Sequence, residues 1–137
     1  MTDFIVIVTL VALVLLVLAG QWLMGRRAAL ARGPAPEGLI GACPGAVLVF
    51  FHTRGCLACR RMHPMIDRLA AVNPGRVCRV DIAEQPALAR AARVVATPTL
   101  MAIDDGRIVS VRLGTLGEAA LVGLARQHGL ETADGNR

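Results

Sequence analysis

The sequence contains no lysine and no tyrosine, and aromatic residues make up only 3% of its 137 residues. All 15 basic residues are arginines, and they are scattered along the chain, although the formal net charge is +5. Beyond the N-terminal segment, the aromatic residues are Phe50 and Phe51. Proteins that bind single-stranded nucleic acid combine basic tracks with stacking aromatics. We therefore exclude nucleic acid as a partner and interpret the arginines as a solvated surface that anionic lipid attracts.

Cysteine is also scarce, because four residues are few for a domain stapled by disulfides. One Cys-x-x-Cys pair is present, formed by Cys56 and Cys59, and no second such pair or His-x-x-x-His pattern accompanies it. Two thiolates supply only half of a tetrahedral zinc site. The other ligands would have to come from Cys43, Cys78, His52 or His63. We therefore expect no metal, and keep a metal-handling protein as the weaker alternative.

Charge is absent from a long N-terminal stretch. Residues 4–19 contain one polar side chain, Thr9, and the apolar character continues to Met24. As a helix, these 21 residues would extend about 31 Å, enough to cross a bilayer core of roughly 30 Å. A cleaved signal peptide would have a basic start and a small-residue cleavage site, and the sequence offers neither. We predict a transmembrane anchor over residues 1–27, with Trp22 at the interface.

The charges that flank this stretch predict its orientation. Arg26, Arg27 and Arg32 follow it, whereas Asp3 precedes it. Because basic residues stay on the cytoplasmic side, we expect a single-pass protein whose C-terminal domain faces the cytoplasm. The periplasmic or extracytoplasmic side is the alternative.

After the anchor, the sequence divides into a Pro- and Gly-rich linker over 28–44, a globular domain over 45–130 and a flexible tail over 131–137. Hydrophobic periodicity and turn residues predict the elements of the domain. In order they are a strand at 46–52, helix 57–72, strand 76–82, helix 86–92, strand 99–103, a hairpin turn at 104–107, strand 107–113, and a helix opened by a capping box at 115–118 and ended by Gly129.

This order, β-α-β-α-β-β-α, predicts an α/β fold. A parallel βαβ half precedes an antiparallel hairpin and a closing helix, which gives one mixed sheet with helices on both faces. The two thiols lie where the first strand of the domain gives way to a helix. Unpaired N–H groups and the dipole of a helix N-terminus favour a thiolate, so the pKa of Cys56 should be depressed. Cys59, one turn further on, is close enough to resolve a mixed disulfide.

Several motifs in this order resemble the thioredoxin family over about residues 45–129. The pair Cys56–Cys59 follows a strand and opens a helix, and Pro64 matches the proline within that helix. Thr97–Pro98 matches the cis-proline loop of the family, and Gly114 matches the glycine after its last strand. The resemblance implies a thioredoxin-like fold and a redox-active disulfide as the only redox group, without a cofactor.

The resemblance also implies residue roles. Cys56 would be the exposed nucleophile and Cys59 the buried resolving thiol. Thr97, Pro98 and Gly114 would contact the substrate backbone. The sequence departs from the family at Gly55 and Leu57-Ala58, at Phe50 in place of a buried carboxylate, and in a first strand and helix that are shortened or absent.

Five further residues carry expectations that the resemblance does not decide. His52 is a candidate modulator of the thiols by proton transfer, and the alternative is a structural histidine. Arg60 is a candidate modulator through its positive charge, and the alternative is a solvated arginine. His63 is expected to be solvated. Cys78 is expected to be a free core thiol, and Cys43 an incidental thiol in an exposed loop or, alternatively, a second redox or glutathionylation site.

Together these features predict a membrane-anchored thiol–disulfide oxidoreductase that reduces disulfides of membrane or membrane-proximal proteins. Its partners would be a disulfide-containing protein substrate and a thiol protein that donates or accepts electrons. The alternative is a thioredoxin-fold binding or assembly factor in which the cysteine pair has no essential redox role.

Overall fold

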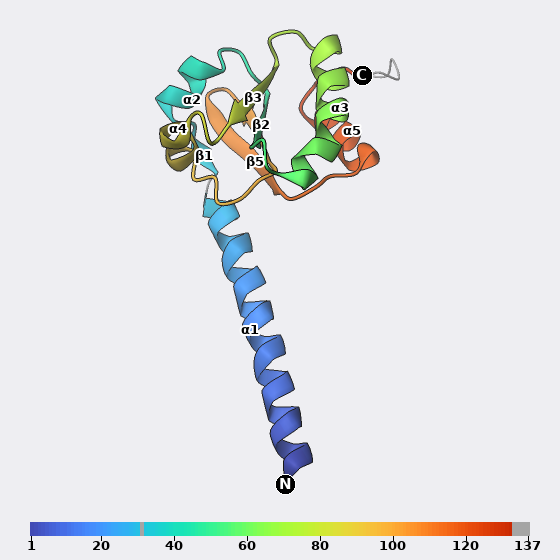
Figure 1. The fold of residues 1–137 in the computed structure, drawn as a ribbon. Coiled ribbons are helices and arrows are strands. Elements are labelled where there is room, and N and C mark those ends of the chain that lie inside the picture. The colour runs from blue at the N-terminus through green and yellow to red at the C-terminus, as the bar shows by residue number, and fades with distance from the viewer. Residues whose placement is uncertain (31, 133–137) are drawn as a thin grey trace.

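The computed structural model describes residues 1–30 and 32–132 of the chain. A long N-terminal helix leads into a small α/β domain (Figure 1). In chain order the elements are α1 (Thr2–Leu30), β1 (Gly33–Pro34), α2 (Glu37–Ala42), β2 (Leu48–His52), α3 (Leu57–Val72), β3 (Val77–Asp81), α4 (Pro86–Ala91), β4 (Thr99–Asp104), β5 (Arg107–Leu113) and α5 (Glu118–Gln127).

The helix α1 contains the stretch Ile5–Leu23, which is long and apolar enough to cross a membrane and is not buried against the domain. A signal sequence near an N-terminus can meet the same criteria of length and hydropathy. The helix continues beyond this stretch to Leu30.

The sheet has five strands in the order β1-β5-β4-β2-β3. Strands β2 and β3 are parallel, as a βαβ unit requires, and the other neighbours are antiparallel. The β4–β5 hairpin turns at Asp105 and Gly106, whose φ angles are 46° and 70°. Both residues have positive φ, as the turn type that matches the twist of a hairpin requires. The expected mixed sheet and the hairpin are therefore confirmed.

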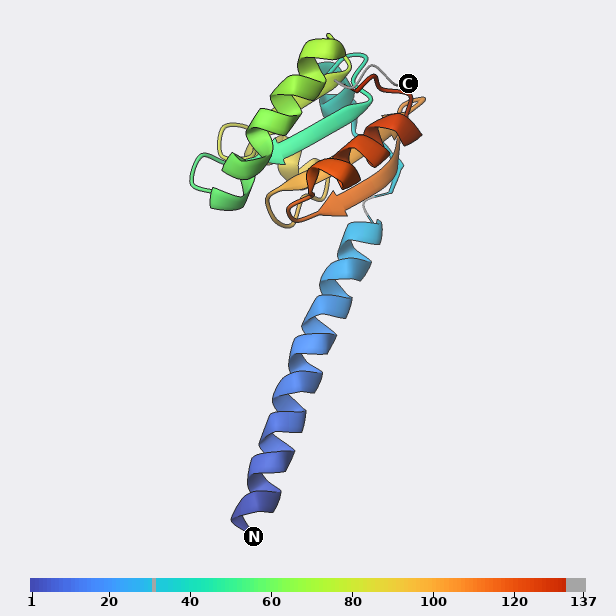
Figure 2. The same ribbon diagram turned by 90° about the vertical axis from the view of Figure 1, so that its right-hand side faces the viewer.

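Helices cover both faces of the sheet, as Figure 2 shows from the side of α3 and α5. The strand β2 is apolar on both sides because it lies inside this three-layer arrangement. Its Leu48 and Phe50 join the core under α3 and α5, whereas Val49 and Phe51 join the core under α2 and α4. All four side chains are fully buried.

The segment expected to be a linker, 28–44, differs from that expectation. Its first residues continue α1, and the following ones form β1 and α2. Ala35 and Leu39 are buried in the core under α2 and α4. The sequence left open whether the first strand and helix of the family are shortened or absent. The structure has them in shortened form, so the folded unit begins before residue 45.

Two expectations about the thiols were wrong. Cys43 and Cys78 form a disulfide across 35 residues, so Cys78 is not free and Cys43 is not an exposed loop thiol. Cys43 ends α2 and is only 5% exposed. The bond therefore joins the short helix α2 to the strand β3. A pairing between residues so far apart leaves no local sequence signal.

The expected capping box at 115–118 was also wrong. The residue before α5 is Gly117, which offers no side-chain cap, and Glu118 forms an ion pair with Arg68 of α3 at 2.7 Å. The predicted flexible tail falls mostly outside the described residues. Its first two residues are held in place. The side-chain amide of buried Asn73 donates to the carbonyl of Glu131 and accepts from its N–H, and Thr132 is buried.

Candidate functional site

Four segments meet at one edge of the sheet. The parallel strands β2 and β3 end together at His52 and Asp81. The antiparallel strand β4 begins there at Thr99, which pairs with Phe51, and β5 ends there at Leu113. We call this the cysteine edge: it comprises residues 53–60, 81–84, 93–99 and 112–114. The register of the sheet thus brings together the predicted site residues Cys56, Cys59, Thr97, Pro98 and Gly114.

The cysteine pair occupies the first turn of α3. Cys56 is the N-cap, and its sulfur accepts a hydrogen bond from the backbone N–H of Cys59 at 3.1 Å. The two residues form a disulfide in this structure, with their Cα atoms 5.2 Å apart. Cys56 is partly exposed, whereas Cys59 is fully buried. A partner can therefore reach the sulfur of Cys56 and not that of Cys59.

The position of Cys56 has an electrostatic consequence. An N-cap group faces the unpaired N–H donors and the positive end of the helix dipole. A thiolate at Cys56 would accept the hydrogen bond from Cys59 that the sulfur already accepts. Both effects stabilise the thiolate, the species that attacks a disulfide.

The loop before β4 lies beside this pair along the edge. The peptide bond between Thr97 and Pro98 is cis. The carbonyl of Pro98 accepts a hydrogen bond from the N–H of Gly114 at 2.8 Å, and the hydroxyl of Thr99 donates to the carbonyl of Ala96 at 2.6 Å. The first bond ties the loop to the residue after β5, and the second closes a turn within the loop.

Two histidines meet between β2 and α3, His52 from the strand and His63 from the helix. The ring of His52 stacks on Phe50, and the ring of His63 meets His52 with centroids 4.8 Å apart. His63 is therefore not a solvated residue as expected, since it also packs edge-on against Phe50. It follows Cys59 by four residues, a spacing that places both on one face of the helix. That spacing is the signal from which the contact could have been foreseen.

Burial lowers the pKa of His52, and the neighbouring His63 lowers it further. The carboxylates of Asp81 and Glu84 act in the opposite direction, and Arg79 adds to the lowering. The Nδ1 atom of His52 is buried without a hydrogen-bond partner in the protein. His52 is thus held as a neutral imidazole with one ring nitrogen uncommitted within the protein.

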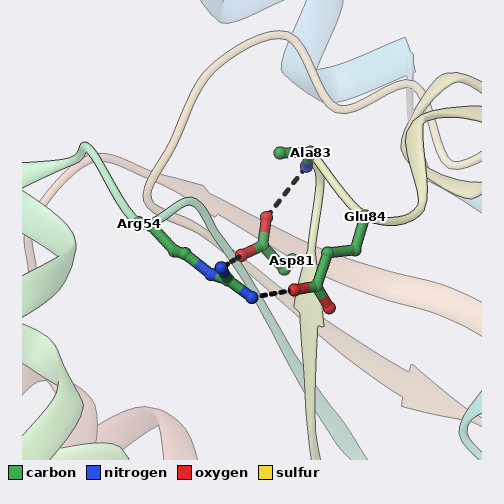
Figure 3. Close-up of polar contacts among 4 residues, drawn as sticks. All are labelled: Arg54, Asp81, Ala83 and Glu84. Carbon is green, nitrogen blue, oxygen red and sulfur yellow. Dashed lines mark hydrogen bonds and ion pairs between the residues drawn. The ribbon is translucent and has the colours of Figure 1, made fainter.

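Sequence reasoning missed a charged cluster that braces the cysteine loop. Arg54, two residues before Cys56, forms ion pairs with Asp81 and Glu84 from the loop after β3 (Figure 3). Asp81 is only 8% exposed and also accepts a hydrogen bond from the N–H of Ala83. Arg54 itself is 84% exposed, so the pairs add little stability. Their effect is to tie the two loops together. The side chain of Arg60, in the first turn of α3, is exposed.

Comparison with known proteins agrees with this geometry. The sequence model of the family described as Thioredoxin matches residues 40–127. The chain belongs to the thioredoxin family. It is 32% identical to the thioredoxin of Chlamydia trachomatis over 85 residues, covering 61% of this chain and 83% of that protein. It is 34% identical to the thioredoxin of Mycolicibacterium smegmatis over 80 residues, covering 56% and 71% of the two chains.

Among solved structures, the thioredoxin of Fasciola hepatica superposes with a TM-score of 0.58 at 30% identity. The match covers 67% of this chain and 89% of that structure. Thioredoxins are thiol–disulfide oxidoreductases that act through a cysteine disulfide without a cofactor. This chain is accordingly a thiol–disulfide oxidoreductase of that family, working on protein disulfides with thiol reductants.

The structure also bears on the metal-handling alternative. Within residues 1–30 and 32–132, no group of three or more His, Cys, Asp or Glu side chains is arranged to hold a metal ion. All four cysteines are in disulfides here, and His52 and His63 contact each other and Phe50.

Proposed function

We propose that the chain is a membrane-anchored thiol–disulfide oxidoreductase that uses Cys56 and Cys59 to reduce disulfides of membrane or membrane-proximal proteins. The observation that carries the proposal is the asymmetry of the pair, with a reachable sulfur at the N-cap of α3 and a buried one within it. A binding or assembly factor would require neither the N-cap position nor the difference in exposure.

The proposed exchange has two steps. The Cys56 thiolate attacks one sulfur of the partner disulfide, whose S–S bond breaks to give a mixed disulfide and a partner thiolate. Cys59 then loses its proton and attacks the Cys56 sulfur, which releases the second partner thiolate and closes the Cys56–Cys59 disulfide. The partner gains two electrons and this chain loses two. A dithiol protein returns the chain to its reduced form by the same steps in reverse.

Other residues of the cysteine edge have supporting roles in this proposal. The backbone of Thr97, together with Pro98 and Gly114, would lie along an extended segment of the substrate. The exposed charge of Arg60 would favour the Cys56 thiolate. His52, kept neutral by burial, would accept the proton of Cys59 in place of the carboxylate that Phe50 replaces.

We further propose that α1 remains in the mature protein as a single membrane span. The apolar stretch Ile5–Leu23 has the required length, and α1 continues without interruption to within three residues of the first strand. Two observations bear on which side the domain occupies. The arginines after the span favour the cytoplasm, whereas the Cys43–Cys78 disulfide favours an oxidising compartment.

We give the disulfide more weight and propose the extracytoplasmic side. The Cys43–Cys78 disulfide lies away from the cysteine edge and has no part in the exchange, and structural disulfides are rare in the cytosol. Only three arginines, Arg26, Arg27 and Arg32, favour the cytoplasmic side.

The decisive experiment compares Cys56→Ser with Cys59→Ser in the full chain. Cys56→Ser should abolish reduction of insulin disulfides by dithiothreitol-reduced protein, because the attacking sulfur is gone. Cys59→Ser should accumulate a mixed disulfide, visible as a band that reductant removes on a non-reducing gel. A Cys56→Ser chain that still supports growth in a complementation assay would instead indicate the binding or assembly factor.

A further inference from the structure

The direction of β1 shows from which side of the domain the N-terminal helix approaches. Strand β1 is antiparallel to β5, with Gly33 opposite Ile108 and Pro34 opposite Arg107. Since β5 runs toward the cysteine edge and ends there at Leu113, β1 runs away from that edge. The chain before Gly33 therefore comes from the side of the domain that carries the cysteine pair.

The connection to the apolar helix is short. Only residues 31 and 32 separate α1 from β1, and two residues span at most about 7 Å. The end of α1 contacts β5. Figures 1 and 2, which view the molecule from directions 90° apart, both show α1 leaving the domain on the side where α3 begins.

The height of the edge above the membrane follows from the length of α1. The apolar stretch ends at Leu23, and the seven residues from 24 to 30 add about 10 Å of helix. The headgroup layer on each side of a bilayer core is roughly 5–8 Å thick. The cysteine edge thus lies at or just above the lipid headgroups, facing them.

The surface of the cysteine edge suits this position. Three large apolar side chains are exposed there: Leu57 at 72%, Val95 at 44% and Leu113 at 37%. Exposed arginines lie on the same edge at positions 54, 60, 93 and 112, whereas its two acidic residues, Asp81 and Glu84, are both paired with Arg54. At the opposite edge Asp104 and Asp105 stand beside Arg76 and Arg107, so the charges there balance. A basic and apolar surface is attracted to anionic headgroups.

We propose that the cysteine edge faces the lipid surface and exchanges electrons with a cysteine pair of an integral membrane protein, held at the level of the headgroups. The proposal rests on the function proposed above and specifies its partner. The exchange is the one already written, in which the partner disulfide is reduced as Cys56–Cys59 closes. A soluble protein would have to enter between the domain and the membrane to reach Cys56.

The orientation can be tested without any redox activity. The full chain carrying Cys59→Ser is labelled at Cys56 with an environment-sensitive fluorophore and placed in nanodiscs of phosphatidylethanolamine and phosphatidylglycerol. Lipids with a headgroup spin label should quench this probe several-fold more strongly than a probe at the opposite edge, attached through Asp105→Cys in a chain that also lacks Cys56 and Cys59. Equal quenching, or stronger quenching at position 105, would overturn the proposal.

A second experiment tests whether the partner is a membrane protein, by moving the domain away from the bilayer. Four Glu-Ala-Ala-Ala-Lys repeats between Arg32 and Gly33 form a semi-rigid helix that lifts the edge by about 30 Å. The probe is a synthetic transmembrane peptide with a disulfide at its interfacial end, in vesicles of the same lipids, and insulin is the soluble control. The rigid insert should lower the rate on the peptide by at least roughly tenfold and leave the insulin rate equal or higher.

A flexible Gly–Ser insert of equal length is the matched control, because it lets the edge return to the surface and should preserve most of the rate on the peptide. A rigid insert that leaves the peptide rate unchanged, in a chain that reduces insulin, would refute the membrane partner alone. If the uninserted chain reduces neither the peptide nor insulin, the proposed function itself fails.

Discussion

At the scale of single residues, the fold alters the ionisation of His52. Burial and the nearby His63 depress its pKa below the value of 6.5 that an unperturbed histidine shows. The unfolded chain therefore binds a proton at a pH where the folded chain does not. By linkage, the free energy of unfolding of the wild type should fall as the pH drops below about 6.5, and level off below the folded pKa.

The variant His52→Gln removes this titration and keeps a polar side chain. The free energy of unfolding is measured with urea on the full chain in neutral detergent. Below about pH 6.5, this free energy should decrease less for the variant than for the wild type. Well above that pH both side chains are neutral, so the difference there serves as the baseline. Parallel pH profiles for the two proteins would contradict the neutral, desolvated imidazole.

The same variant separates proton transfer from simple packing. If His52 accepts the Cys59 proton, resolution of the mixed disulfide should slow in His52→Gln while formation of the mixed disulfide keeps its rate. A purely structural role would change both steps together, through the position of α3. Quenched-flow trapping of the mixed disulfide measures the two steps separately.

At the scale of elements, the Cys43–Cys78 disulfide holds the short helix α2 against β3. The chain-entropy estimate for a closed loop of 35 residues is about 4 kcal/mol of stability. The double variant Cys43→Ala/Cys78→Ala should lose a free energy of unfolding of this order in urea, with insulin reduction preserved below the transition. The matched control, Cys56→Ala/Cys59→Ala, opens a loop of only three residues and should lose about 1.5 kcal/mol. Equal losses would mean that loop closure is not the source of stability.

The elements also show what a sequence can predict. Strand β2 was predictable because its apolar run has to be buried on both faces, and the β4–β5 turn because Asp105-Gly106 tolerates positive φ. Local pattern placed Cys56 and Cys59 where a strand gives way to a helix. Thr97, Pro98 and Gly114 were expected only from the resemblance to the thioredoxin family, because nothing in their local pattern indicates which other segments they meet.

Features that depend on tertiary contact could not be predicted in this way. Strand β1 has two residues and α2 has six, too few for any periodicity. Glu118 pairs with Arg68 across 50 residues instead of closing a capping box. The link between Asn73 and Glu131 spans 58 residues. Each of these contacts is determined by the folded neighbour and not by the adjacent sequence.

At the scale of the whole molecule, the anchor and the second disulfide together determine where the exchange can occur. The variant Cys59→Ser leaves Cys56 as the one free thiol while Cys43–Cys78 stays closed. We expect a membrane-impermeant maleimide to label Cys56 of this variant in intact cells, after disruption of any outer layer. The domain would then lie in a compartment where Cys43–Cys78 forms, and its electrons would have to come across the membrane from a thiol donor.

Labelling that requires permeabilisation of the inner membrane would reverse this assignment. The positively charged residues after the span would then have decided the topology, and the domain would reduce its partners from the cytoplasm. In that case Cys43 and Cys78 should be found as thiols after rapid acid quenching and alkylation, because the cytosol keeps accessible disulfides reduced. A reduced sample, treated with dithiothreitol before labelling, excludes an oxidised Cys56 as the cause of a negative result. Since both measurements depend on one compartment, sidedness and the state of the Cys43–Cys78 pair should change together.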